Sequence, residues 1–379
     1  MSAKTKILIC GILPPPYFGH SMMYKMLLAT DFPNVFDVIF FNMHFWTYEQ
    51  HKKVTMRKLF KMIRYLFGFI TTILARRPKY LLYNISFDRI PLPKDFLFCF
   101  LGKILGCRIV LHDMGQYVKV LYEESGWLKR WMVRWICRNA AAAIVLGEVT
   151  KKEYKGLMNE ERIFSVPGSV EDTQKGEVLP RWKEESTIKV LYFSFLSVSK
   201  GIWTALKAIL PAIQKNPRID FTFAGPAESP QLQKDIEDFC HNQKLNGQVR
   251  MMGYVGDEEA RTKVFREHDI FIFPTHRDVF GLVLLHAMAE GLPVVASREG
   301  AIPEIIRDRE NGFLFAKGDV QALAEHIVAL ANDQPLRHKI GMANRERYES
   351  FYTPQKYGER MIRAFEEIER GGEKVQRGY

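Results

Sequence analysis

The chain has 379 residues, and 47% of them are hydrophobic, which is enough for substantial cores and excludes a disordered protein. Two domains are expected at this length, because a single core stops growing near roughly 250–300 residues. The formal net charge of +11 indicates an anionic partner such as phosphates, acidic lipid or nucleic acid.

The first predicted strand covers residues 6–10, and a loop containing Gly19 and His20 follows it before a helix over 22–28. A glycine between the first strand and helix of an α/β fold lets the backbone approach a ligand closely. Gly19 and His20 are therefore candidate ligand-binding residues, and a purely conformational role for Gly19 is the alternative. The chain runs directly into this strand, so we expect no signal peptide. The scattered cysteines, without CxxC spacing, favour a reducing cytosol and indicate no zinc site (Cys10, Cys99, Cys107, Cys137, Cys240).

Residues 52–79 contain nine Lys and Arg side chains and no acid. Arg57, Lys61 and Arg64 share one helical face, and apolar residues occupy the other (Leu59, Met62, Ile63, Leu66, Ile70, Ile73). The uncharged run 65–75 is too short to span a bilayer. The pattern predicts a basic amphipathic helix on an anionic membrane surface. The alternative is a core helix whose outer face is basic.

Strands are predicted at 80–83 and 108–111, joined by a helix over 94–105, and the second strand ends at His112 and Asp113. The carboxyl end of a parallel strand lies at the edge where ligands bind in open α/β folds. His112 is therefore a candidate site residue. Asp113 would orient its imidazole or cap the following helix.

Trp127, Trp131 and Trp135 recur every four residues on a predicted helix, next to an arginine stripe (Arg130, Arg134, Arg138). This arrangement is typical of a membrane interface or of an aromatic platform for an acceptor, and inward packing is the alternative. A strand over 143–146 follows. The polar segment 172–187 then carries Gly and Pro without apolar periodicity, as a linker would.

The second half of the chain opens with a strand over 188–193, a loop to Lys200, and a helix over 202–213. Two more strands are predicted at 221–224 and 249–252, followed by a helix over 258–267. Gly225, in the loop after the first of these strands, is a candidate ligand contact, and Tyr254 and Val255 lie in the loop after the second.

The most informative stretch is 269–312. An apolar run at 270–273 predicts a buried parallel strand, Gly281 opens a helix that Gly291 closes, and 293–297 predicts the next strand, before a short helix over 302–307. This strand–loop–helix–strand unit has a tight glycine turn at the helix start. The N–H groups of Leu282 and Val283 at that turn would suit a phosphate.

This stretch resembles the signature region of the family-four retaining glycosyltransferases. The matching residues are Pro274, Phe280, Gly281, Leu282, Ala287, Met288, Ala289, Gly291, Pro293, Val294, Val295, Gly300, Glu304, Asn311 and Gly312. The resemblance implies an α/β protein of GT-B fold, with two Rossmann-like parallel-sheet domains facing each other across a cleft. Domains are then expected at 1–171 for the acceptor and 188–353 for the nucleotide sugar, with a helix over 354–379 crossing back to the first domain.

The resemblance also assigns roles to residues. Lys200 would neutralise the donor diphosphate, with Gly19 facing it, and Phe195 stands where the family has an accompanying arginine. Apart from the resemblance, Arg277 is our own candidate for supplying some of the missing charge. Asp278 and His286 replace the family's paired glutamates, which hold a sugar hydroxyl and the ribose hydroxyls; the alternative for His286 is helix packing. His112 would lie near the donor sugar, and the backbone at Tyr254 and Val255 would read the base.

The sequence therefore predicts a metal-independent hexosyltransferase without cofactors, cytoplasmic and peripheral on the inner face of the membrane. It would move a sugar from a UDP- or GDP-sugar to a glycan or lipid-linked acceptor in bacterial surface polysaccharide or lipopolysaccharide synthesis. One alternative is a catalytically degenerate GT-B protein that acts as a binding or scaffold partner, motivated by Phe195 and His286. Two others are a sugar-nucleotide epimerase and a nucleic-acid binder through 52–79. The aromatics of that segment are spaced as on a helix rather than for base stacking, so no nucleic acid is expected.

Overall fold

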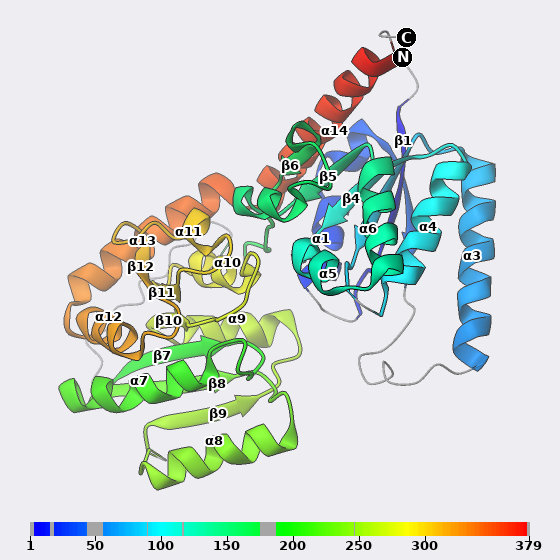
Figure 1. The fold of residues 1–379 in the computed structure, drawn as a ribbon. Helices are drawn as coiled ribbons and strands as arrows, with labels where there is room; N and C mark the ends of the chain where they lie inside the picture. Colours follow the sequence, from blue (N-terminus) through cyan, green and yellow to red (C-terminus); the bar gives the residue numbers. More distant parts are fainter. Residues whose placement is uncertain are drawn as a thin grey trace. The chain divides into compact units, whose positions relative to one another are not determined.

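The computed structural model describes residues 4–15, 19–43, 56–88, 90–115, 117–174, 187–245 and 247–376. The chain forms two compact units (Figure 1): Met1–Gly168 together with Pro354–Tyr379, and Ser169–Thr353. Most of the predicted linker, residues 175–186, lies outside the described residues, as do Lys52 and Lys53 of the basic segment.

The first unit is built on a six-stranded sheet of order β2-β1-β3-β4-β5-β6, in which every strand pairs in parallel with its neighbours. Its central strands are short apolar runs whose side chains are buried on both faces, as expected when helices cover both sides of a parallel sheet. The strands are β1 (Lys6–Gly11), β2 (Asp37–Asn42), β3 (Tyr80–Ile85), β4 (Arg108–Asp113), β5 (Ala142–Val145) and β6 (Ile163–Ser165).

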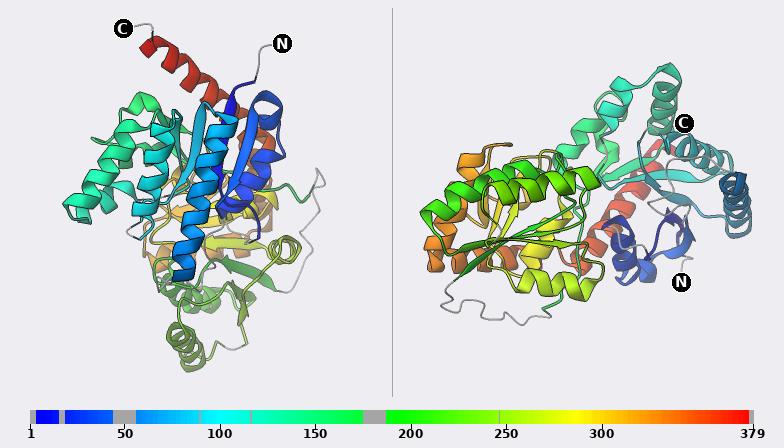
Figure 2. Two further views of the ribbon diagram at one scale, coloured as in Figure 1. Left: turned by 90° about the vertical axis from the view of Figure 1, so that its right-hand side faces the viewer. Right: turned by 90° about the horizontal axis from the view of Figure 1, so that it is seen from below.

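Helices α3, α4 and α6 lie side by side on one face of this sheet (Figures 1 and 2), and Phe69 and Phe98 join them to the sheet in one buried core. The helices and 3-10 turns of the unit are α1 (Gly19–Leu28), α2 (Phe32–Val35), α3 (Met56–Arg76), α4 (Leu92–Ile104), α5 (Val118–Glu124), α6 (Trp127–Asn139), η2 (Glu148–Tyr154) and η3 (Glu160–Arg162).

The C-terminal helix α14 (Pro354–Gln376) belongs to the first unit. The Phe365 ring contacts the rings of Phe32, Phe36 and Tyr80, and the Glu369 carboxylate accepts a hydrogen bond from Lys79 Nζ at 2.8 Å.

The second unit repeats the plan with a six-stranded parallel sheet of order β12-β11-β10-β7-β8-β9. The predicted strand–loop–helix–strand unit is present as β10, α10 and β11. The strands are β7 (Ile188–Phe193), β8 (Ile219–Ala224), β9 (Val249–Gly253), β10 (Ile270–Phe273), β11 (Val294–Ser297) and β12 (Gly312–Phe315). The helices are α7 (Ile202–Lys215), α8 (Pro230–Asn242), α9 (Glu258–Arg266), α10 (Leu282–Ala289), α11 (Ile302–Ile305), α12 (Val320–Asn332) and α13 (Gln334–Phe351).

The two Rossmann-like parallel sheets confirm the predicted α/β fold class. Ile63 belongs to the predicted apolar face of the helix at 52–79, and the structure leaves its side chain 54% exposed. The reason is that α3 packs through Met62, Leu66 and Phe69, and Ile63 lies beside this stripe rather than on it. Across the residues with described coordinates, none of the helices is long and apolar enough to cross a membrane.

Candidate functional site

The loops at the carboxyl edge of the second sheet pack backbone against backbone. Gly201 has φ +73°, and a Cβ atom there would lie 1.8 Å from the carbonyl oxygen of Pro274. Gly225 has φ +138°, and its Cβ would lie 1.9 Å from the carbonyl oxygen of Ser194. Only glycine fits at either position, so the loops after β7, β8 and β10 are held together at one edge. Gly225 therefore has a clear conformational role.

Lys200 and Asp278 meet at this edge. Lys200 Nζ lies 2.5 Å from Asp278 Oδ2 and 3.4 Å from the carbonyl oxygen of Arg277. The two side chains are 28% and 16% exposed, so the ion pair is accessible from solvent. Strands β7 and β10 are neighbours in the sheet, which is why residues far apart in sequence come together here.

The Asp278 carboxylate also fixes the turn into α10. Its Oδ1 accepts a hydrogen bond from the N–H of Phe280 at 3.2 Å, and the Phe280 side chain is buried. Gly281 then takes the left-handed conformation as the N-cap of α10, and no side chain caps the helix there. The first N–H groups of a helix have no partner within it, so those of Leu282 and Val283 add partial positive charge beside Lys200.

His286 lies on α10, with its ring centroid 6.0 Å from that of Phe265 on α9. Burial lowers the pKa of His286 well below its usual value, and the nearby Arg261 guanidinium lowers it further. The imidazole is therefore neutral near pH 7 and offers one N–H donor and one acceptor nitrogen. The ring packs between helices α9 and α10, and part of the residue's surface remains exposed.

The remaining predicted residues of this edge differ in exposure. Arg277 and Tyr254 are exposed, the latter by 73%, and Val255 is half-buried. Phe195, at the family's arginine position, is half-buried, and its carbonyl accepts a hydrogen bond from Tyr192 Oη at 3.3 Å.

Sequence reasoning missed a second cation at this edge. Lys317 Nζ, from the loop after β12, lies 3.0 Å from Glu299 Oε2 and 3.1 Å from the carbonyl oxygen of His276. The His276 ring in turn bonds Thr204 Oγ1 at 2.8 Å. No motif marks Lys317; its place after a buried four-residue run, Gly312–Phe315, was the available signal.

In the first unit, His112 and Asp113 are both completely buried. His112 Nδ1 lies 3.0 Å from Tyr24 Oη, and its Nε2 has no hydrogen-bond partner among the described residues. Burial lowers the pKa of His112 from 6.5 to about 3, so the ring is neutral. Asp113 accepts hydrogen bonds from the N–H of Gly115 at 3.0 Å and from Tyr154 Oη at 2.7 Å.

At the other predicted loop of the first unit, Gly19 is exposed and starts α1. His20 is half-buried, and burial lowers its pKa. Both residues lie after the carboxyl end of β1, as predicted from the sequence.

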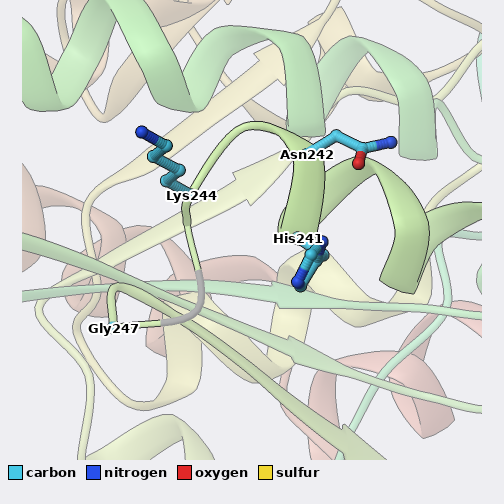
Figure 3. A pocket seen from close by; sticks show the side chains of 4 residues that line it. All are labelled: His241, Asn242, Lys244 and Gly247. Atoms are coloured by element: carbon cyan, nitrogen blue, oxygen red, sulfur yellow. The ribbon is translucent and has the colours of Figure 1, made fainter.

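A separate surface hollow occurs at the end of α8 (Figure 3), lined by His241, Asn242, Lys244 and Gly247. It precedes β9, so it belongs to the amino edge of the second sheet, opposite the Lys200–Asp278 pair. None of the predicted site residues lines it. Within the described ranges, no group of three or more His, Cys, Asp or Glu side chains is arranged to hold a metal ion.

Comparison with known families places the recognisable domain in the second unit. Residues 187–333 match the family Glycosyl transferases group 1. A sulfoquinovosyl transferase of Arabidopsis thaliana is 40% identical over 40% of this chain and 29% of its own length. A capsular polysaccharide biosynthesis glycosyltransferase, CapM of Staphylococcus aureus, is 30% identical over 43% of this chain and 42% of its own. A phosphatidyl-myo-inositol mannosyltransferase of Mycobacterium leprae is 29% identical over 47% of this chain and 46% of its own. The chain thus spans less than half the length of these relatives.

Solved structures match over almost the entire chain. Anabaena HepE in complex with UDP superposes with a TM-score of 0.71 at 16% identity, covering 96% of this chain and 100% of that one. Sucrose-phosphate synthase from Thermosynechococcus elongatus superposes with a TM-score of 0.71 at 17% identity, covering 97% of this chain and 100% of that one. At such low identity, these matches establish the fold. The chain therefore has the GT-B fold, and residues 187–333 of its second unit match the Glycosyl transferases group 1 family.

Proposed function

We propose that the protein is a retaining glycosyltransferase that moves a sugar from a UDP- or GDP-sugar to a glycan or lipid-linked acceptor. The observation that carries the proposal is the accessible Lys200–Asp278 pair beside the left-handed turn that opens α10. An ammonium group and a helix N-terminus at one sheet edge make a site for a diphosphate. The family match of residues 187–333 covers both of these residues.

The site fits the charge that develops during sugar transfer. As the bond between the anomeric carbon and the donor phosphate breaks, negative charge grows on the departing nucleoside diphosphate. Lys200 and the N–H groups of Leu282 and Val283 would stabilise this charge without a metal ion. The acceptor hydroxyl forms the new bond to the anomeric carbon, and its proton passes to the departing phosphate oxygen.

Asp278 would hold a hydroxyl of the donor sugar with the carboxylate that now bonds Lys200 and the Phe280 N–H. His286 would contact the ribose through its neutral ring, and the backbone at Tyr254 and Val255 would lie at the base. Gly19 and His20 of the first unit are proposed to contact the donor or the acceptor.

The proposed setting is the inner face of a bacterial membrane, in surface polysaccharide synthesis. CapM is named for capsular polysaccharide biosynthesis, and the mannosyltransferase relative for phosphatidyl-myo-inositol. A degenerate GT-B protein that binds a nucleotide sugar without turnover is the second candidate, because Phe195 and His286 replace ionisable family residues.

The first experiment is calorimetric titration with UDP, GDP, ADP and CMP and their sugars, on the wild type and on Lys200→Ala. Hydrogen bonds to charged groups contribute about 1.5–3 kcal/mol, so Lys200→Ala should weaken binding of the preferred nucleotide roughly tenfold to a hundredfold. The control is Lys263→Ala, since Lys263 is 74% exposed in the last turn of α9, at the other edge of the sheet. Equal affinities for all three proteins would contradict the proposed donor site.

A further inference from the structure

Several large apolar side chains of the first unit lie on its surface and not in its core. Six of them form what we call the apolar rim: Phe60, Ile63, Phe67, Ile90, Trp127 and Trp131. Each is at least half exposed, and Ile90 and Trp127 are exposed by 77% and 80%. Single exposed apolar residues are normal on a soluble protein, whereas a gathered set indicates an interaction surface.

The topology gathers these six residues at one edge of the sheet. Helix α3 connects β2 to β3, α4 connects β3 to β4, and α6 lies between β4 and β5. All these strands are parallel, so each helix starts at the carboxyl edge and runs back along the sheet. The rim residues lie between Phe60 and Phe67 on α3, just before α4, and in the first turns of α6. The three helices stand side by side (Figures 1 and 2).

Aromatic packing holds Trp131 of the rim in place. The ring of Phe96 on α4 lies 5.2 Å from both the Trp131 and the Trp135 rings, and Phe100 lies 5.4 Å from Trp135. Of the predicted tryptophan face, Trp135 is therefore packed inward, while Trp127 and Trp131 reach the surface. Beneath α3, Phe69 packs on Phe98 of α4. The helices that carry the rim thus pack on one another through aromatic rings.

Positive charge accompanies the rim on α3 and α6, while the exposed acids nearest to it lie outside these helices, at Asp88, Glu123 and Glu124. Lys61 and Arg64 lie between the rim residues of α3, and Arg130 and Arg134 follow Trp127 and Trp131 on α6. Neither helix contains an acidic residue. The guanidinium groups of Arg130 and Arg134 lie 5.9 and 5.5 Å from the centroid of the Tyr122 ring.

We propose that the apolar rim docks on an anionic lipid bilayer, with Phe60, Ile63, Phe67, Ile90, Trp127 and Trp131 entering the headgroup region. Tryptophan at the rim and arginine behind it are the side chains that lipid interfaces favour, and basic residues near the surface attract anionic headgroups. The aliphatic members, Ile63 and Ile90, offer nothing to a nucleic-acid base. This inference rests on the proposed function, which includes a lipid-linked acceptor, and it deepens that function. Docking of the rim would bring the carboxyl edge of the first sheet to the membrane.

The test is sedimentation of the full chain with vesicles of phosphatidylcholine alone and of an equimolar mixture with phosphatidylglycerol. Phe60→Gln with Phe67→Gln should weaken binding to the mixed vesicles roughly tenfold or more, and Trp127→Gln should do the same, since burial of such side chains accounts for binding. Lys61→Gln with Arg64→Gln should remove much of the preference for phosphatidylglycerol. Ile104→Gln is the matched control, because Ile104 is 63% exposed at the opposite end of α4.

Several outcomes would overturn the proposal. One is equal vesicle binding by the rim variants and the Ile104 control. A second is tighter binding to an oligonucleotide than to the mixed vesicles, which would assign the basic face to nucleic acid. A third is a change from dimer to monomer in the rim variants with no change in vesicle binding, which would make the rim a contact between copies. Nucleotide titration of the same variants separates this proposal from the donor site, since it should be unchanged whatever the vesicles show.

Discussion

Polar residues follow the strands at the carboxyl edge of both sheets, but their environments differ. In the second unit, Lys200 and Asp278 follow β7 and β10 and form an accessible ion pair. In the first unit, His112 and Asp113 end β4 and are completely buried, bonded to Tyr24 and Tyr154. A polar residue at a strand end thus locates the edge, but burial decides between ligand contact and internal support. The accessible pair is the better donor-site candidate.

The largest expected effect comes from the glycine that lets the Lys200 loop approach β10. Gly201→Ala should lower the free energy of unfolding by about 3 kcal/mol or more, because the new Cβ would collide with the Pro274 carbonyl at a positive φ. Urea unfolding would measure this loss, and nucleotide binding should fall with it.

The matched control for this prediction is Gly318→Ala. Gly318 has φ +81°, close to that of Gly201, but no atom lies within 4 Å of its added Cβ. Its cost should be limited to the backbone strain of about 1–2 kcal/mol. Equal losses in the two variants would show that the close packing of the loops has no energetic weight.

The buried histidine predicts a specific pH dependence of stability. The unfolded chain protonates His112 near pH 6.5, whereas the folded chain does so only near pH 3. The unfolded state therefore binds more protons between these values, and stability falls as the pH drops through this window. At about pH 5 this single group should cost roughly 2 kcal/mol relative to neutral pH.

His112→Gln isolates that contribution. The difference in unfolding free energy between neutral pH and about pH 5 should shrink by about 2 kcal/mol in this variant. The same substitution at the exposed His241 serves as the matched control. A pH dependence of His112→Gln identical to that of the wild type would mean that His112 is accessible to protons in the folded chain.

The smallest expected effect concerns the missing arginine. Phe195→Arg restores a cation at the family's position, half-buried in the Lys200 loop, and should tighten nucleoside-diphosphate binding about threefold to tenfold. Val198→Arg is the control, because it adds the same charge to an exposed position of the loop. Titration calorimetry would compare them. Equal tightening by both would indicate a general effect of charge rather than a specific phosphate contact.

Much of the fold could be predicted because the central strands are uninterrupted apolar runs. The strands at 188–193 and 270–273 were predicted with the bounds that the structure shows. By contrast, β12 has four residues and starts at Gly312, whose missing Cβ accommodates the Val294 carbonyl of the next strand. Gly312 thus allows close packing of the two strands. Because glycine has a low strand propensity, the sequence does not predict a strand here.

The candidate site was only partly predictable from the sequence. Both Lys200 and Asp278 were identified, but their contact across 78 residues depends on the pairing of β7 with β10. The burial of His112 could not be predicted, because it results from the packing of Tyr24 over Gly11, where the ring occupies the space that a Cβ would need. Periodicity assigns Ile63 to the apolar face of its helix, but it does not show which part of that face meets neighbouring elements, and the structure leaves Ile63 exposed.

The most direct test of the account is the stereochemistry of sugar transfer. The wild type would be incubated with the nucleotide sugar that binds best and with a lipid-linked or glycan acceptor, and the anomeric configuration of donor and product would be followed by NMR. The account predicts a product with the donor's configuration, and a loss of turnover of roughly a hundredfold or more in Asp278→Asn with nucleotide affinity largely kept. Inversion of the configuration, or tight binding of a nucleotide sugar without any turnover, would contradict it.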